Sequence, residues 1–247
     1  MSPTLSTDLV LLAIHGSPGF TKDFDPLFRE SKLNGMQLQA IPADSAHIET
    51  ALRSSEADMT AIVGYSWGAY AVLKTLLQAP SLHPRIVVLI APFLAPSEKL
   101  TPAAALLARA PLLSDLIVSL SWKKWRASLG ERMFHEKDTD AAASYLKRLD
   151  NPAPWKDVLK RKLLQENEPL VRAQTPKTKV HIVFGEKDRI TNIDATENLL
   201  RSLGIHFSAS KIPGAEHGLL WTHTALLAAE IARIVADSSL AEKGSRL

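Results

Sequence analysis

The chain has 247 residues, of which 46% are hydrophobic, so it can form one large α/β domain or two small ones. It contains no cysteine, which excludes disulfides, thiolate metal sites and cysteine nucleophiles and agrees with a reducing compartment such as the cytoplasm, where we expect the protein. The net charge is +3, and the positive excess lies in residues 94–178, where 15 Lys and Arg stand against 10 Asp and Glu.

Six short apolar runs are typical of buried β-strands. They lie at residues 9–14, 36–41, 61–63, 85–91, 179–184 and 207–212. Continuous Val, Ile and Leu runs, as in residues 86–90, suit strands of a parallel sheet that is covered by helices on both faces. Because helical patterns follow most of the runs, the sequence predicts the α/β class, with a mostly parallel sheet of about six strands flanked by helices.

Helices are predicted from amphipathic patterns and stop signals between these runs. We expect them at residues 21–33, 45–54, 69–77, 193–203 and 219–236. Gly204 is a typical helix stop, because glycine readily adopts the left-handed conformation that ends many helices. The most apolar later stretch, residues 103–120, is interrupted by two charged residues and a proline, so we expect no stable insertion into a membrane.

Residues 94–178 break the alternation of strands and helices. No strand-like run occurs there, and the helical patterns are separated by prolines. We therefore predict a helical cap at residues 94–178, inserted into a core of residues 1–93 and 179–247. Ligands of open α/β sheets bind at the carboxyl ends of the strands, so the cap is expected to cover that edge. Its basic clusters, residues 123–126 and 160–162, are either solvated helix faces or contacts for anionic substrates, lipid headgroups or nucleic acid.

The pentapeptide Gly-Tyr-Ser-Trp-Gly at residues 64–68 carries the strongest functional signal. It follows an apolar run and precedes a helical pattern, which places Ser66 in a sharp turn between a strand and a helix. Glycines flank the serine because two backbone segments pass close together in such a turn. The Ser66 hydroxyl then stands clear of the sheet, and the backbone N–H of Trp67 points to the same place, where it can stabilise an oxyanion.

Three further motifs follow strand-like runs. They are His-Gly-Ser-Pro-Gly at residues 15–19, Phe-Gly-Glu-Lys-Asp at residues 184–188 and Pro-Gly-Ala-Glu-His-Gly at residues 213–218. With the pentapeptide, and in this order, they make the chain similar to the α/β-hydrolase superfamily, specifically to the capped serine hydrolases that include carboxylesterases and lipase-like enzymes. The resemblance implies an α/β-hydrolase fold with a helical cap insertion.

The resemblance also implies a catalytic triad of Ser66, His217 and Asp188, in the family's chain order. A serine hydroxyl is almost never ionised at neutral pH, so it needs a histidine that accepts its proton and a carboxylate that orients this histidine. The N–H of Ser17 is implied as a second oxyanion donor beside that of Trp67. Other acids compete for the third place in the triad: Glu186, Asp194 and Glu98.

Aromatic and apolar residues of the predicted cap are candidates for the lining of a substrate pocket. They are Trp122, Trp125, Phe134, Trp155 and the stretch 106–120. If they line the pocket, they favour a lipophilic acyl or alcohol group in the substrate. Alternatively, they only pack the cap onto the core.

The predicted function is that of a serine hydrolase that cleaves a carboxylic ester or thioester of a small, lipophilic molecule through an acyl-enzyme. The same triad would serve a C–C bond hydrolase or an acyltransferase, and a non-catalytic binding protein with this fold is a further alternative. The sequence contains no His-x-x-x-His pair and no phosphate-binding glycine motif. We therefore expect no metal and no cofactor. A nucleic-acid role would rest only on the basic clusters, so we expect no nucleic-acid partner.

Overall fold

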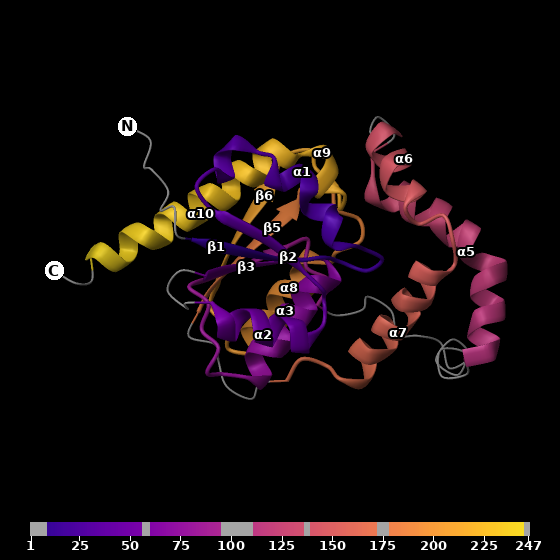
Figure 1. The fold of residues 1–247 in the computed structure, drawn as a ribbon, viewed down its shortest axis with the longest axis horizontal. Coiled ribbons are helices and arrows are strands. Elements are labelled where there is room, and N and C mark those ends of the chain that lie inside the picture. The colour runs from indigo at the N-terminus through magenta and orange to yellow at the C-terminus, as the bar shows by residue number, and fades with distance from the viewer. Residues whose placement is uncertain (1–8, 56–59, 95–110, 136–138, 172–177, 245–247) are drawn as a thin grey trace.

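The computed structural model describes residues 9–55, 60–94, 111–135, 139–171 and 178–244, which fold around one parallel β-sheet (Figure 1). Its strands are β1 (Val10–Ile14), β2 (Gln37–Ile41), β3 (Thr60–Tyr65), β4 (Ile86–Ile90), β5 (Lys179–Gly185) and β6 (Phe207–Ile212). All neighbouring strands are parallel, in the order β2-β1-β3-β4-β5-β6. The structure confirms the predicted α/β class and six-stranded sheet, and each strand lies within two residues of its expected range.

The central strands are the most apolar because helices cover both of their faces. Every residue of β3 and β4 is buried, whereas β2, at one edge, alternates exposed and partly buried residues before Ile41. Continuous burial explains why β4 reads Ile-Val-Val-Leu-Ile, since neither face of this strand meets water.

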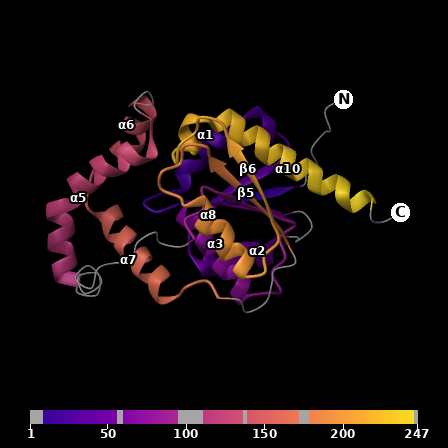
Figure 2. The same ribbon diagram turned by 180° about the vertical axis from the view of Figure 1, so that it is seen from behind.

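Helices cover the two faces of the sheet and bury two apolar clusters (Figure 1 and Figure 2). One face carries α2 (Ser45–Ser54), α3 (Trp67–Gln78) and α8 (Ile193–Ser202), and the other carries α1 (Asp25–Phe28), α9 (Leu219–Thr222) and α10 (Thr224–Gly244). Successive side chains of β1 enter the clusters in turn. Leu12 and Ile14 belong to the first, and Leu11 and Ala13 to the second.

The carboxyl ends of all six strands meet at one edge of the sheet, because the strands are parallel. The chain passes from β1 to β2 on one side and then to β3 on the other side of β1. Such a reversal opens a crevice in which ligands of doubly wound sheets bind. The loop at residues 15–19 and the turn at Ser66 follow the two strands that border this crevice.

The helix predicted at residues 21–33 is wrong in extent. The segment forms the 3₁₀ helix η1 (Thr21–Phe24), then α1, then the 3₁₀ helix η2 (Ser31–Leu33), with an extended Glu30 before η2. In one continuous helix, Leu33 would point about half a turn away from Phe24, because each residue advances by about 100°. The break allows both side chains to be fully buried.

The helix predicted at residues 219–236 is divided at His223 and extends to Gly244. The backbone of His223, with φ −128° and ψ 35°, leaves the helical region between α9 and α10. Both helices still contribute apolar side chains to the same cluster. The division therefore lets the short α9 follow the loop after β6 while the long α10 lies along the sheet.

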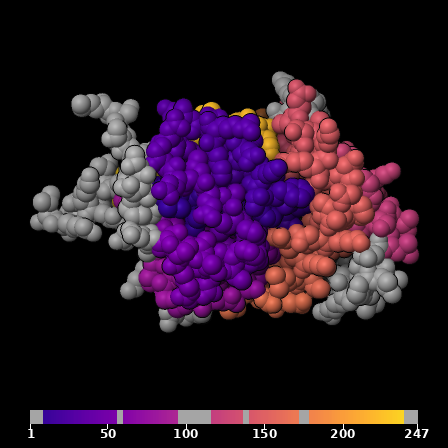
Figure 3. Space-filling view, viewed as in Figure 1, coloured from indigo at the N-terminus to yellow at the C-terminus, as the bar shows by residue number. Residues whose placement is uncertain are grey.

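Between β4 and β5, the described residues form three helices that lie as a separate group beside the sheet. They are α5 (Pro111–Met133), α6 (Thr139–Lys147) and α7 (Ala153–Asn167), and they share an apolar cluster of their own. In the space-filling view of Figure 3, the atoms of α6 and α7 lie against the N-terminal part of the chain. The division into a core (1–93 and 179–247) and a cap (94–178) stays a prediction.

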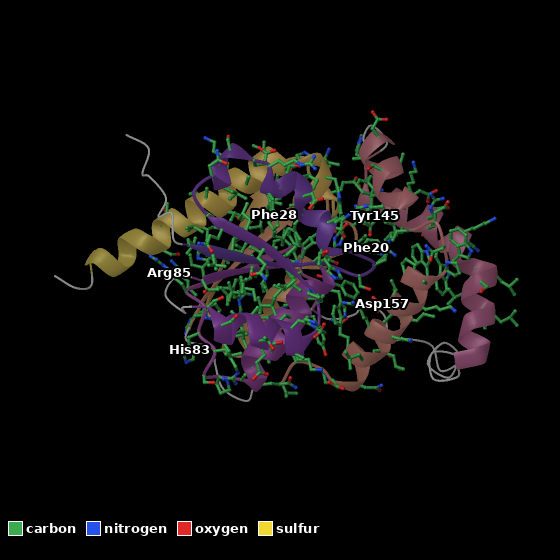
Figure 4. All side chains as sticks on the ribbon, viewed as in Figure 1. Phe20, Phe28, His83, Arg85, Tyr145 and Asp157 are labelled. Atoms are coloured by element: carbon green, nitrogen blue, oxygen red, sulfur yellow. The ribbon has the colours of Figure 1, made fainter. Side chains whose placement is uncertain are left out.

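Hydrogen bonds fasten α6 and α7 to the core. Tyr145 donates its hydroxyl to the Pro18 carbonyl at 2.7 Å, and Figure 4 shows this side chain between α6 and the core. Gln165 donates from Nε2 to the carbonyls of Phe93 and Leu94, at 2.9 and 2.7 Å. These bonds hold α6 and α7 over the loops that follow β1 and β4.

The buried carboxylate of Asp23 joins the end of α6 to the core. It is 1% exposed, lies 2.6 Å from Arg148 Nη1 and accepts the Phe20 N–H at 2.9 Å. Burial raises the pKa of this carboxyl group to about 6, although the Phe20 N–H and the Arg148 guanidinium act in the opposite direction. A carboxyl whose pKa is raised by folding stabilises the fold in its protonated form. Its contribution is therefore complete below about pH 4 and is lost as the pH rises through about 6.

We expect Asp23→Asn to become progressively more stable than the unmodified protein as the pH rises from about 4 to about 7. The amide keeps the shape of the side chain but removes the charge, whose burial costs on the order of 2–3 kcal/mol for a pKa raised to about 6. Urea unfolding at several pH values measures the difference. Asp194→Asn, at an exposed position of α8 that does not affect the pKa of Asp23, is the control. A difference in stability that does not change with pH would contradict this role of Asp23.

Candidate active site

Ser66 lies in a strained turn between β3 and α3. Its backbone has φ 52° and ψ −118°, a conformation that residues with a side chain rarely adopt and that costs on the order of 1–3 kcal/mol. The Ser66 N–H donates to the Ile90 carbonyl at 2.8 Å, and the Phe93 N–H donates to the Ser66 carbonyl at 3.1 Å. The end of β4 and the residues after it therefore hold the conformation that presents the serine.

The glycines on either side of Ser66 allow backbone segments to approach closely. A Cβ atom at Gly64 would lie 2.8 Å from Ala69 Cα, and one at Gly68 would lie 2.4 Å from the Ile14 carbonyl oxygen. Neither distance leaves room for a side chain. The geometry thus agrees with the physical reason for expecting glycine at both positions.

The structure brings the three predicted catalytic side chains into one hydrogen-bonded line. Nε2 of His217 lies 3.1 Å from Ser66 Oγ, and Nδ1 of His217 lies 2.9 Å from Asp188 Oδ2. The side chains of His217 and Asp188 are 4% and 0% exposed. Since a carboxylate only accepts hydrogen bonds, Nδ1 carries the proton and donates it, which leaves Nε2 to accept the Ser66 hydroxyl.

Asp188 is held as a carboxylate in the loop after β5. Burial raises its pKa, but the neighbouring His217 imidazole and the N–H groups of Thr191 and Ile190 outweigh this effect, so that its pKa lies below the usual value. These two N–H groups donate to Asp188 Oδ1 at 2.9 and 2.8 Å. One oxygen of the carboxylate is thereby anchored, and the other faces the histidine.

The competing acids occupy other places. Glu186 is exposed and accepts the Gly214 N–H at 2.8 Å, and Asp194 is exposed on α8. Glu98 lies outside the described residues. Asp188 is thus the acid that contacts the imidazole within the described part of the chain.

Sequence reasoning missed Thr191, whose hydroxyl lies beside the imidazole of His217. Its Oγ1 donates to the Ala91 carbonyl at 3.2 Å and lies 3.4 Å from His217 Nδ1. The only signal for it in the sequence is its position three residues after Asp188, and no motif distinguishes it from other loop threonines.

The loop after β6 that carries His217 is anchored on both sides. Tyr65 donates its hydroxyl to the His217 carbonyl at 3.0 Å, and burial raises the pKa of this tyrosine well above the usual value, so the hydroxyl stays a donor. The Gly218 N–H donates to the Met133 carbonyl at the end of α5, at 2.8 Å. The position of the imidazole therefore depends on β3 as well as on α5.

The predicted oxyanion donors lie at the same cavity as Ser66. Trp67 is the first residue of α3, where backbone N–H groups have no partner within the helix and the helix dipole favours negative charge. Ser17, in the loop after β1, also lines the cavity. His15 precedes this loop; its Nδ1 lies 2.8 Å from the Gly16 carbonyl oxygen, and burial lowers its pKa. The donor roles of Ser17 and Trp67 stay a prediction.

The cavity has a volume of about 440 Å³ and lies between the sheet edge and α5–α7. Its lining combines the loops after β1, β3, β4, β5 and β6 with side chains from all three helices. The helices contribute Leu129, Arg132, Met133, Tyr145, Val158, Arg161, Lys162 and Gln165.

The aromatic residues predicted to line the pocket do not line this cavity. Phe134 and Trp155 are buried in the cluster of α5–α7, and Trp122 and Trp125 pack against it. The rings of Trp125 and Trp155 meet edge to face, with centroids 6.2 Å apart. The alternative that these residues pack the helices is therefore the one observed, and they give no support to a lipophilic substrate. Of the stretch 106–120, residues 106–110 lie outside the described residues.

Among the described residues, no group of three or more His, Asp and Glu side chains could hold a metal ion. None of the helices in this part of the chain is long and apolar enough to cross a membrane.

Comparison with known proteins places this site in context. A family model described as serine aminopeptidase, S33, matches residues 37–222, and no curated protein sequence matches the chain. A thermophilic esterase from Thermogutta terrifontis, solved with malate bound, has 16% identity and a TM-score of 0.69, over 94% of this chain and 91% of that one.

Two more solved structures share the fold. A lipase-esterase related protein from Clostridium acetobutylicum has 16% identity and a TM-score of 0.63, over 92% of this chain and 94% of that one. The RedJ thioesterase of the prodiginine biosynthetic pathway of Streptomyces coelicolor has 17% identity and a TM-score of 0.58, over 92% of this chain and 90% of that one. At these identities the three structures establish the fold alone.

We expect Gly68→Ala to destabilise the protein by more than about 3 kcal/mol or to prevent folding. The new Cβ would lie 2.4 and 2.5 Å from the carbonyl oxygens of Ile14, the last residue of β1, and His15, which directly follows it; both are backbone atoms at the end of a central strand and have little freedom to shift. Gly130→Ala, within α5, is the control, because its Cβ would meet only the end of the Leu146 side chain. Thermal unfolding of both variants measures the effect. Equal melting temperatures would contradict the close contact at Gly68.

Proposed function

The chain belongs to the serine aminopeptidase S33 family of α/β-hydrolases, and we propose that it is a serine hydrolase that cleaves a carboxylic ester or thioester of a small molecule. The observation that carries this proposal is the 3.1 Å contact between His217 Nε2 and Ser66 Oγ, continued at 2.9 Å to Asp188. Such a line joins a nucleophile, a base and a group that orients the base.

In the proposed reaction, Ser66 Oγ attacks the carbonyl carbon of the substrate while His217 Nε2 accepts the hydroxyl proton. The carboxylate of Asp188 stabilises the imidazolium that forms. The resulting oxyanion accepts hydrogen bonds from the backbone N–H groups of Trp67 and Ser17. The tetrahedral intermediate then expels the alcohol or thiol, which takes the proton from His217 and leaves an acyl group on Ser66.

Water completes the cycle by the same steps. His217 accepts a proton from a water molecule as the water oxygen attacks the acyl carbon, and it returns this proton to Ser66 Oγ when the carboxylic acid leaves. The protein's own residues supply every group in this sequence, so we propose a reaction without a cofactor.

We further propose that residues 94–178 act as a cap on a core of residues 1–93 and 179–247. Side chains from α5, α6 and α7 line the cavity that contains Ser66, which supports this division. A cap of this kind excludes water from the site and selects substrates by shape and charge.

Ester or thioester cleavage is favoured among the reactions that the triad could catalyse. The solved neighbours include an esterase and a thioesterase, which agrees with this bond class. The same groups would serve a C–C bond hydrolase or an acyltransferase. A non-catalytic binding role is disfavoured by the unbroken line of contacts from Asp188 to Ser66.

We expect Ser66→Ala to abolish labelling by a fluorophosphonate probe and to lower the kcat for p-nitrophenyl ester hydrolysis by about 10³-fold or more. Loss of the hydroxyl removes the nucleophile and leaves only binding and the oxyanion donors. Ser202→Ala, at an exposed serine of α8, is the control and should keep full labelling. Persistent labelling of Ser66→Ala would remove the assignment of the nucleophile.

We expect Asp188→Asn to lower kcat by about 10³-fold or more while the protein remains folded. The amide can donate to Nδ1 of His217, which would place the imidazole proton on Nε2 and stop it from accepting the Ser66 proton. Asp194→Asn and Glu186→Gln, at the competing acids, are the controls. A larger loss in either control than in Asp188→Asn would transfer the acid role to that residue.

A further inference from the structure

The cavity that contains Ser66 is lined by three cationic side chains, and we infer that it binds substrates that carry a carboxylate or phosphate group. The cations are Arg132, in the last turn of α5, and Arg161 and Lys162, on α7. This assignment rests on the proposed hydrolysis at Ser66 and adds the chemical class of the substrate to it.

The charge of the cavity lining is of one sign. None of the described residues that line the cavity is an Asp or a Glu. Like charges around a partly enclosed space repel one another, and walls of low dielectric constant concentrate their field inside it. An anionic group that enters the cavity relieves this repulsion, whereas a neutral ligand leaves it in place.

Arg161 holds its guanidinium in a defined place beside the candidate nucleophile. Its Nε pairs with Asp157, which Figure 4 shows between α7 and the core, and its Nη1 donates to the Ala43 carbonyl at 3.3 Å. The guanidinium carbon lies 4.4 Å from the ring centre of Trp67, the residue after Ser66. Nη2 has no partner among the described residues, so it is a donor that is already oriented, which lowers the entropic cost of binding an anion.

Arg132 and Lys162 have no carboxylate partner in the described part of the chain. Several other helix cations are paired with acids three or four residues away: Arg53 with Glu49, Arg201 with Glu197, and Arg233 with Glu230. Arg132 and Lys162 lack such a partner among the described residues, so their charges remain available to a ligand.

The other helical residues of the lining are mainly apolar: Leu129, Met133, Tyr145 and Val158. The ligand that fits this lining therefore combines an apolar segment with a charged group. This description replaces the expectation of a purely lipophilic substrate.

Matched substrate pairs test the inference. We expect kcat/KM for mono-p-nitrophenyl adipate to exceed that for p-nitrophenyl hexanoate by about tenfold or more, since the two differ by one terminal carboxylate. The phosphate arm compares para-acetoxyphenyl phosphate with para-methoxyphenyl acetate. A preference in one arm identifies the anion, and no preference in either arm overturns the inference.

The preference for the anionic ester should also shrink in about 1 M NaCl, where the Debye length is about 3 Å.

Charge variants locate the effect. In the double variant Arg132→Gln/Lys162→Gln, the ratio of kcat/KM between the anionic and the neutral ester should fall toward one. The double variant Lys124→Gln/Lys160→Gln, which removes the same charge from exposed positions of α5 and α7 outside the cavity lining, should leave the ratio unchanged. An equal fall in both variants would attribute the preference to overall charge and overturn the assignment.

A binding measurement separates this inference from the proposed reaction. Isothermal titration of Ser66→Ala with the adipate and hexanoate esters reports the charge preference without turnover. If the unmodified protein cleaves neutral esters at Ser66 but neither kinetics nor binding favours the anionic ester, the inference alone fails. If Ser66→Ala binds the anionic ester preferentially but no ester is cleaved by the unmodified protein, the proposed function alone fails.

Discussion

The parallel direction of the six strands is the constraint on which the site depends. Ser66, Asp188 and His217 follow three different strands, and they can meet only because all carboxyl ends lie at one edge of the sheet. The register of the backbone hydrogen bonds, with Tyr65 opposite Ile90 at the end of β3, sets how far each loop extends beyond this edge. The 2.9 Å contact between His217 and Asp188 and the 3.1 Å contact between His217 and Ser66 therefore depend on the arrangement of the whole sheet.

Much of the core and of the site could be predicted because the informative residues are close in sequence to the strands that position them. Ser66 comes directly after a run that alternates into both apolar clusters, and His217 comes five residues after Ile212, the last residue of β6. Local sequence patterns do not predict the features that tertiary packing determines. The break at Glu30 follows from the need to bury Leu33, and Thr191 matters only because the fold brings its hydroxyl to 3.4 Å from His217 Nδ1.

The lining of the cavity could not be predicted for the same physical reason. Which face of α5 or α7 meets the sheet depends on how the helices dock, and their amphipathic pattern is weak. Trp122 and Trp125 are large and apolar, yet they serve the packing of α5–α7, while Arg161 reaches the core and stacks on Trp67. A cluster of basic residues in the sequence thus divides into members inside the cavity, Arg161 and Lys162, and one outside it, Lys160.

The hydrogen bond from Gly218 to the Met133 carbonyl makes the histidine loop and α5 parts of one unit. Phe134 also lies so close to Gly218 that a Cβ atom there would be 2.6 Å from its ring. Exchanging α5–α7 for the equivalent helices of another hydrolase would therefore change the support of His217 together with substrate selectivity. In this chain, a graft that alters selectivity must provide an acceptor for the Gly218 N–H. It must also provide a side chain that packs against Gly218 as closely as Phe134 does.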